Sequence, residues 1–259
     1  MYVQRCAVCD DPAEPFGALV CSRCRTIPEP VGDHVCEKCG KPLDGEGRLV
    51  CSDCAGASHS FDRGAAVFRY RSVSGGMFRF KYQGRAEYAE WYGAKMAERL
   101  LNGRNEAMER LRNADFIIPV PISSAKLLVR GYNQAALLAR RVSQITGIPV
   151  REDILGRGND TKPMKYMSVP ERRQNLKKAL IVYGNDVKSK VTMLIDDIYT
   201  TGATMDACAG VLKDAGAREV HFLTLAIGAD VPDAGPEAAD EETYAQRREN
   251  PADDQDVRI

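Results

Sequence analysis

The chain has 259 residues, of which 44% are hydrophobic and 28% are charged. The length exceeds one average domain, and the composition is typical of globular proteins, which excludes collagen-like, fully disordered and membrane-spanning classes. No apolar run approaches the roughly 18–20 residues that a membrane helix needs, and the first residues lack the pattern of a signal peptide. We therefore expect a cytoplasmic protein, and in that reducing compartment paired cysteines favour metal ligation over disulfides.

The net charge of zero conceals an uneven distribution. From Asp230 onward the chain carries ten acidic and three basic residues, whereas residues 121–190 carry fourteen basic and five acidic ones. A basic central region favours anionic partners such as phosphates, nucleotides or nucleic acid, although a solvated surface is the ordinary alternative. The tail, residues 230–259, has few large apolar side chains to bury, so we expect it to be disordered.

The first region, residues 1–58, contains eight of the nine cysteines in an internal repeat of four Cys-x-x-Cys pairs, each separated from the next by eleven residues. Two such pairs supply four thiolates at the tetrahedral geometry that zinc prefers. We predict two structural zinc ions. One would bind Cys6, Cys9, Cys21 and Cys24, and the other would bind Cys36, Cys39, Cys51 and Cys54. An interleaved pairing and iron–sulfur ligation stay open.

The three histidines and the remaining cysteine have simpler expected roles. His34 and His59 lie near the cysteine repeat, but no cysteine is missing that they would replace. His221 falls in a predicted strand and is expected to be packed. Cys208 falls in a predicted helix and is expected to be a buried thiol.

Residues 61–229 alternate short apolar strands with amphipathic helices, which predicts a parallel α/β sheet. The segments 65–71 and 76–82 are predicted to form a hairpin that leads into this domain. Helices are expected through Arg99, from Asn133 to Gly147, and over 203–215, and strands are expected over 115–120, 191–195 and 219–227.

The segment 191–205, VTMLIDDIYTTGATM, predicts a phosphate site. A strand ends in Asp196 and Asp197, and a turn of threonines and glycine then opens a helix. Unpaired N–H groups at a helix N-terminus favour anions, and Gly202 lets the backbone approach closely. Two carboxylates suit such a site if they bind sugar hydroxyls or magnesium, which a ribose 5-phosphate would satisfy. A plain strand-to-helix turn capped by threonine is the alternative.

This segment resembles the phosphoribosyl-diphosphate signature of type I phosphoribosyltransferases, and with the cysteine repeat in front the chain resembles the ComF family, also called competence protein F. Further segments agree in order over residues 1–229: Lys81-Tyr82-Gln83-Gly84, Pro119-Val120-Pro121, Arg130-Gly131-Tyr132-Asn133-Gln134, and a loop with Thr161, Ser168, Glu171, Arg172 and Asn175. The chain departs from the family at Met164, where glutamine is expected, and at Leu180, where an aromatic residue is expected.

The resemblance implies a type I phosphoribosyltransferase-like parallel sheet flanked by helices, preceded by a small double zinc ribbon. It also implies that Asp196 and Asp197 act as catalytic residues that hold the ribose hydroxyls and magnesium. The 5-phosphate would bind to Thr200, Thr201, Gly202, Ala203 and Thr204. Arg130 and Gly131 would lie near the diphosphate, and residues 157–172 would form a cover containing Arg157, Lys162, Lys165 and Arg172.

Three functional hypotheses stay open. The first is a ComF-type protein that binds phosphoribosyl diphosphate and single-stranded DNA in DNA uptake, with a DNA-translocating helicase as a candidate partner implied by the resemblance. Tyr132 and Tyr166 lie among its basic residues, where they would stack on bases or simply pack. The second is an enzyme that transfers the pentosyl group to an acceptor that no motif identifies. The third is a non-catalytic sensor of phosphoribosyl diphosphate.

Overall fold

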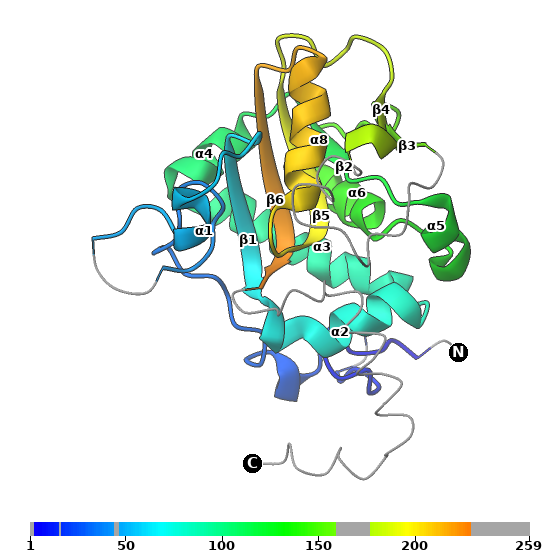
Figure 1. Ribbon diagram of the computed structural model, residues 1–259. Helices are drawn as coiled ribbons and strands as arrows, with labels where there is room; N and C mark the ends of the chain where they lie inside the picture. The colour runs from blue at the N-terminus through cyan, green and yellow to red at the C-terminus, as the bar shows by residue number, and fades with distance from the viewer. Residues whose placement is uncertain (1–2, 16, 44–46, 159–176, 229–259) are drawn as a thin grey trace.

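The computed structural model describes residues 3–15, 17–43, 47–158 and 177–228. Its centre is a four-stranded parallel sheet with the order β1-β6-β5-β2, and β3 and β4 form a separate antiparallel pair (Figure 1). The strands are β1 (Arg63–Arg69), β2 (Phe116–Pro119), β3 (Leu155–Arg157), β4 (Leu180–Val182), β5 (Val191–Tyr199) and β6 (Glu219–Ile227). The helices are η1 (Ser22–Cys24), α1 (Ser52–Ala55), α2 (Tyr70–Tyr82), η2 (Ala86–Tyr88), α3 (Ala89–Asn102), α4 (Glu106–Arg112), α5 (Ser124–Arg130), α6 (Gln134–Thr146) and α8 (Ala203–Asp214).

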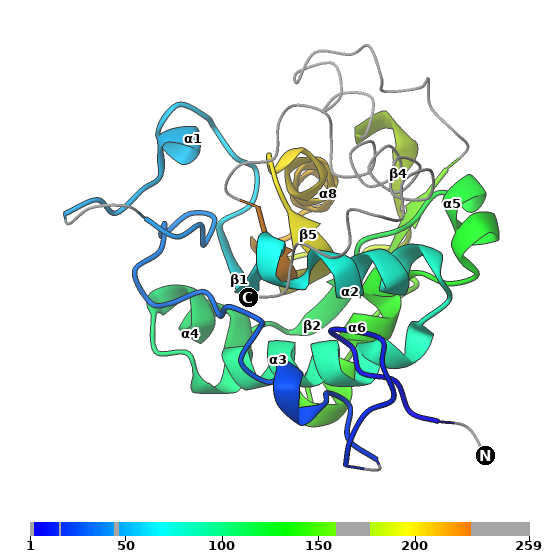
Figure 2. The same cartoon turned by 90° about the horizontal axis from the view of Figure 1, so that it is seen from below.

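Helices cover both faces of the parallel sheet, which confirms the predicted fold class. Figure 2 shows α8 on one side of the sheet and α3 and α6 on the other. The core on the α3 and α6 side includes Met193 and Ile195, whereas Leu194 and Phe222 belong to the core on the α8 side. Because side chains alternate between the faces of a strand, the apolar run of β5 fills both cores. Across the described ranges, no helix combines the length and the apolar character needed to cross a membrane.

Helix α6 forms where the sequence predicts it, because both of its ends carry cap residues. The Asn133 side chain accepts a hydrogen bond from the Ala135 N–H at 3.0 Å, and Gly147 ends the helix with a φ of 77°. Leu138 and Val142 are fully buried on the face that packs against α3. Local signals were therefore sufficient to predict this element.

The predicted hairpin over 65–71 and 76–82 is wrong. Strand β1 pairs in parallel with β6, and α2 follows it directly. Val73, Met77 and Phe80 lie buried along α2 at the spacing of one helix face. The apolar residues therefore follow the helical period, and the adjacent glycines inside α2 do not form a turn.

Strand β5 is longer than the predicted 191–195. Its parallel pairing with β6 continues as far as Tyr199, opposite Ile227. Asp196 and Asp197 are therefore strand residues, and the turn begins only after Tyr199.

The segment between the two cysteine sets pairs with the outer edge of the sheet. Pro30 forms an antiparallel bridge with Phe68, and the Val31 N–H donates to the Val67 carbonyl oxygen at 2.8 Å. Residues 1–58 therefore lie directly against the sheet region. The division into domains at 1–58, 61–229 and 230–259 stays a prediction.

Two adjacent glycines in α2 provide a test of how closely the first cysteine loop packs. A Cβ atom at Gly76 would lie 2.3 Å from both the Ala7 carbonyl oxygen and the Tyr92 hydroxyl oxygen, whereas at Gly75 the nearest atom would be 3.6 Å away. We expect Gly76→Ala to lower the free energy of unfolding by about 1–3 kcal/mol through overpacking. Gly75→Ala should raise it by about 0.5–1 kcal/mol, because alanine favours the helix. Denaturant titration of both variants measures the difference, and equal effects would contradict the packing described here.

Candidate functional site

The turn between β5 and α8 presents backbone donors at the carboxyl end of the sheet. Gly202 has a φ of 81° and is the N-cap residue of α8, so the cap position itself carries no side chain that could occupy the first-turn N–H groups. Thr201 and Thr204 are exposed on either side of this glycine, and Thr200 is half-buried. First-turn N–H groups and the positive end of the helix dipole favour an anion at such a place. The geometry is compatible with the predicted phosphate cradle.

Glycine is required at position 202 by its surroundings as well as by its backbone angle. A Cβ atom there would lie 2.7 Å from the Tyr199 hydroxyl oxygen. The Tyr199 ring is stacked on Phe222, with 4.9 Å between the ring centroids, and Phe222 is fully buried. The turn therefore lies on a packed aromatic pair that cannot move aside for a side chain.

The two acidic residues of the motif lie in different surroundings. Asp197 is buried, and its carboxylate lies 3.3 Å from Nζ of Lys81 in α2. Asp196 is half-buried, and it accepts a hydrogen bond from the Asp197 N–H at 2.8 Å. Burial and the negative charge of Asp196 together raise the pKa of the Cys208 thiol in α8. Because neighbouring strand residues point to opposite faces, the doublet contains one carboxylate facing α2 and one on the α8 side.

Lys81 belongs to this site, although sequence analysis gave it no role beyond the family resemblance. It is 4% exposed, and its ammonium group neutralises the buried Asp197 carboxylate. Removing either partner would leave an uncompensated buried charge, which is strongly destabilising. The pair therefore connects the C-terminal end of α2 to β5.

A hollow of about 480 Å³ lies beside the end of β2. It is lined by the predicted site residues Gly131 and Arg157 and by apolar side chains that include Leu155. The positive charge of Arg157 acts on the same Cys208 thiol as the charge of Asp196, in the opposite direction. Asp196 and Arg157 thus have opposite effects on the pKa of the same thiol.

The other predicted basic contacts are not brought together in the same way. Arg130 stacks over the Tyr82 ring, 4.9 Å from its centroid, and donates a hydrogen bond to the Tyr82 hydroxyl oxygen at 3.1 Å. Arg172, Lys162 and Lys165 lie outside the described residues.

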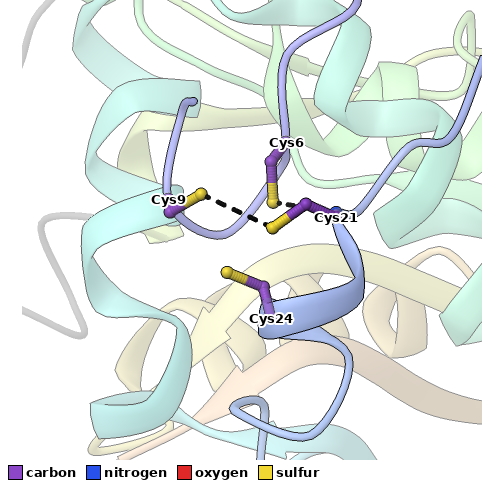
Figure 3. Close-up of side chains that lie close together, drawn as sticks. All are labelled: Cys6, Cys9, Cys21 and Cys24. Atoms are coloured by element: carbon purple, nitrogen blue, oxygen red, sulfur yellow. Dashed lines mark hydrogen bonds between the residues drawn. The ribbon is translucent and has the colours of Figure 1, made fainter. Parts of the chain in front are cut away.

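The cysteine repeat forms two separate sets of four. In each set the four Sγ atoms lie within 4.8 Å of one another. Figure 3 shows the first set, in which one loop contributes Cys6 and Cys9, and Cys21 and Cys24 lie at the short helix η1. The second set contains Cys36, Cys39, Cys51 and Cys54. Four converging sulfurs fit tetrahedral zinc, so the structure confirms the predicted sets and excludes the interleaved pairing.

Local contacts prepare these sulfurs for metal binding. The N–H groups of Val8 and Cys21 donate to Cys6 Sγ at 3.5 and 3.4 Å. The thiolate is the form that binds zinc, and N–H donors stabilise a thiolate, so these contacts suit the first set to metal binding.

Three side chains outside the motif behave as simple packing predicts. Cys208 and His221 are each 1% exposed, as expected for a buried thiol and a packed histidine. The Tyr132 hydroxyl donates to the Phe80 carbonyl oxygen, and burial raises the pKa of Tyr132 to about 12. These contacts favour packing over base stacking for Tyr132, and Tyr166 lies outside the described residues.

Comparisons with known proteins agree with this geometry. Residues 1–55 match a double zinc ribbon domain. Competence protein F from Haemophilus influenzae is 34% identical over 152 residues, covering 57% of this chain and 65% of that protein. The DNA utilization protein YhgH from Escherichia coli O157:H7 is 28% identical over 145 residues, covering 56% of this chain and 63% of that protein. An amidophosphoribosyltransferase from Methanothermobacter thermautotrophicus is 28% identical over 134 residues, covering 48% of this chain and 26% of that enzyme.

These findings describe an α/β chain with two four-cysteine sites in front of a parallel sheet, similar in sequence to a competence protein and to an amidophosphoribosyltransferase. The chain is thus similar to competence protein F over a little more than half of its length, in agreement with the family resemblance of its motifs. It spans slightly less than two thirds of the competence and DNA utilization relatives described above.

The two cysteine sets predict two zinc ions per chain, which metal analysis of the purified protein would measure. Replacing Cys6 and Cys9 by serine should leave one zinc, and so should replacing Cys36 and Cys39, because each set is complete in itself. A wild-type protein without zinc, or a paired variant that loses both ions while it stays folded, would contradict the assignment.

Proposed function

We propose that this protein binds phosphoribosyl diphosphate, together with magnesium, at the turn between β5 and α8. The observation that carries the proposal is the N-terminus of α8, which begins at the left-handed Gly202 and directly follows a strand containing two carboxylates. A sugar phosphate matches both features, because its phosphate is an anion and its hydroxyls are donors to carboxylates.

Each part of the turn has a distinct role in this proposal. The phosphate accepts hydrogen bonds from the N–H groups of residues 202–204 and from the threonine hydroxyls. The half-buried Asp196 holds the ribose hydroxyls, and Asp197, fixed by Lys81, orients the end of the strand. Magnesium, when bound with the ligand, supplies positive charge that neutralises the diphosphate, and carboxylates such as Asp196 are the ligands it prefers.

Single-stranded DNA is the second ligand of the proposal. It is supported by the similarity to a DNA utilization protein and by the excess of basic residues in 121–190. Part of this excess is neutralised, because Arg140 pairs with Glu152 and Arg151 pairs with Asp153 and Asp186. We place the proposed DNA contacts at α5, a helix that carries Lys126 and Arg130 and contains no acidic residue. The helicase partner stays a hypothesis drawn from the family resemblance. The cytoplasmic location stays a hypothesis drawn from the cysteine content.

Pentosyl transfer is a second candidate function, favoured by the hollow of about 480 Å³ lined by Arg157. Its size lies in the range of small-molecule sites. In such a reaction an acceptor forms a bond to C1 of the ribose while the bond to diphosphate breaks, and positive groups stabilise the departing negative charge. Diphosphate release in the presence of amines or nucleobases would support transfer, and ligand binding without release would support a sensor.

The sugar-phosphate site is tested by replacing only Asp196, the half-buried member of the acidic doublet. Asp196→Asn should weaken binding of magnesium and phosphoribosyl diphosphate by about tenfold or more, equivalent to about 1.4 kcal/mol. Asp153→Asn, at an exposed carboxylate paired with Arg151, is the matched control and should not change the affinity. Calorimetric titration measures both, with zinc content as a check on folding. Equal affinity of the wild type and the Asp196 variant would contradict the assignment.

DNA binding is tested by fluorescence anisotropy with a labelled single-stranded oligonucleotide. The affinity should fall steeply as salt rises, because phosphate contacts release counterions. Lys126→Ala should weaken binding and reduce the salt dependence, whereas Lys95→Ala, in α3, should not change either. No binding by the wild type at low salt would remove DNA from the proposal.

A further inference from the structure

A buried histidine–aspartate pair joins the segment after the second cysteine set to the helix of the phosphate turn. Nδ1 of His59 and Oδ2 of Asp206 are 2.8 Å apart, and their side chains are 3% and 0% exposed. The Ser60 N–H donates to the other oxygen of Asp206 at 2.8 Å. Asp206 belongs to the first turn of α8, where its own N–H donates to the Gly202 carbonyl oxygen. Both oxygens of this carboxylate are therefore held by residues 59 and 60.

Aromatic ring contacts also connect the segment of residues 59–61 to the phosphate turn. His59 stacks on Phe61 with 4.6 Å between the ring centroids, and Phe61 meets Tyr199 edge to face at 6.2 Å. Tyr199 is the residue whose hydroxyl lies against Gly202. On its other side, Phe61 is covered by Lys38, whose Nζ lies 5.3 Å from the ring centroid and donates to the Phe61 carbonyl oxygen. Since Lys38 lies between Cys36 and Cys39, the contacts extend from the second cysteine set to the phosphate turn.

The two cysteine sets differ in what they touch. The second set belongs to the same core as Tyr199 and Met205, beside the phosphate turn. The first set belongs to the opposite core, with Met77 and Tyr92. Its own link to the rest of the protein is the half-buried Asp10, whose carboxylate lies 2.9 Å from Arg85 and also accepts a hydrogen bond from Tyr88. The chain therefore contains an internal control, because one zinc loop contacts α8 and its repeat contacts α2 and α3.

We propose that the second cysteine set positions the phosphate turn through the His59–Asp206 pair, and that the first set has no such role. Zinc would order the loop that carries Lys38 and thereby hold Phe61, His59 and the first turn of α8. Without it, a ligand must order the turn itself, and that entropy cost lowers its affinity. The statement about affinity depends on the proposed function, whereas the ordering of the turn does not.

Hydrogen exchange in the full-length, zinc-loaded protein tests the ordering directly. The amides of residues 202–206 should exchange about tenfold faster or more in His59→Phe, which keeps the ring stack but removes the donor to Asp206. His59→Asn should restore slow exchange, because its amide nitrogen can take the place of Nδ1. Asp10→Asn, at the equivalent link of the first set, should leave these amides unchanged.

Two double cysteine variants, one in each set, distinguish the effect of the second set on the phosphate turn from that of the first. Serine at Cys36 and Cys39 should accelerate exchange at residues 202–206 and weaken binding of phosphoribosyl diphosphate by about tenfold. Serine at Cys6 and Cys9 should loosen the first loop but leave exchange at 202–206 as in the wild type. Equal acceleration by both pairs, or none by His59→Phe, would overturn the inference. If the wild type binds no phosphoribosyl diphosphate, the proposed function fails, and the exchange rates still decide whether the second set positions the turn.

Discussion

Ligation of metal by the two cysteine sets is the interaction on which the N-terminal region depends. Few large apolar side chains are available in residues 1–58, so zinc must supply much of the free energy that a hydrophobic core normally supplies. The two sets do not form a core of their own, because each is part of a core of the α/β sheet, one on either face. Metal ligation therefore contributes to the packing on both sides of the sheet.

Charge neutralisation shapes the region around the phosphate turn. Three carboxylates, Asp196, Asp197 and Asp206, lie in β5 or the first turn of α8. Asp197 is paired with the ammonium group of Lys81, and Asp206 is hydrogen-bonded to His59. The ion pair with Lys81 reduces the repulsion that an incoming phosphate would otherwise meet from Asp197.

Local patterns predicted the parts of this structure that local forces determine. The even spacing of the cysteine pairs identified both sets, and the caps Asn133 and Gly147 identified α6. The hairpin prediction failed because these glycines lie inside a helix, where Gly76 allows close packing against Ala7 and Tyr92 instead of forming a turn. The separation of the acidic doublet and the His59–Asp206 pair escaped sequence analysis because their partners come from distant segments; His59 and Asp206 are 147 positions apart. No periodicity or spacing reports such contacts.

The pairing of residues 30 and 31 with β1 affects whether another molecule can pair with this edge of the sheet. An open strand edge offers unpaired N–H and C=O groups on which another chain can add a strand, and this is a common route to aggregation. Here the connection between the zinc loops covers that edge with Pro30, which has no N–H to offer a neighbour, and with Val31. The segment between the two cysteine sets thus occupies backbone groups at the β1 edge of the sheet that a second chain would otherwise meet.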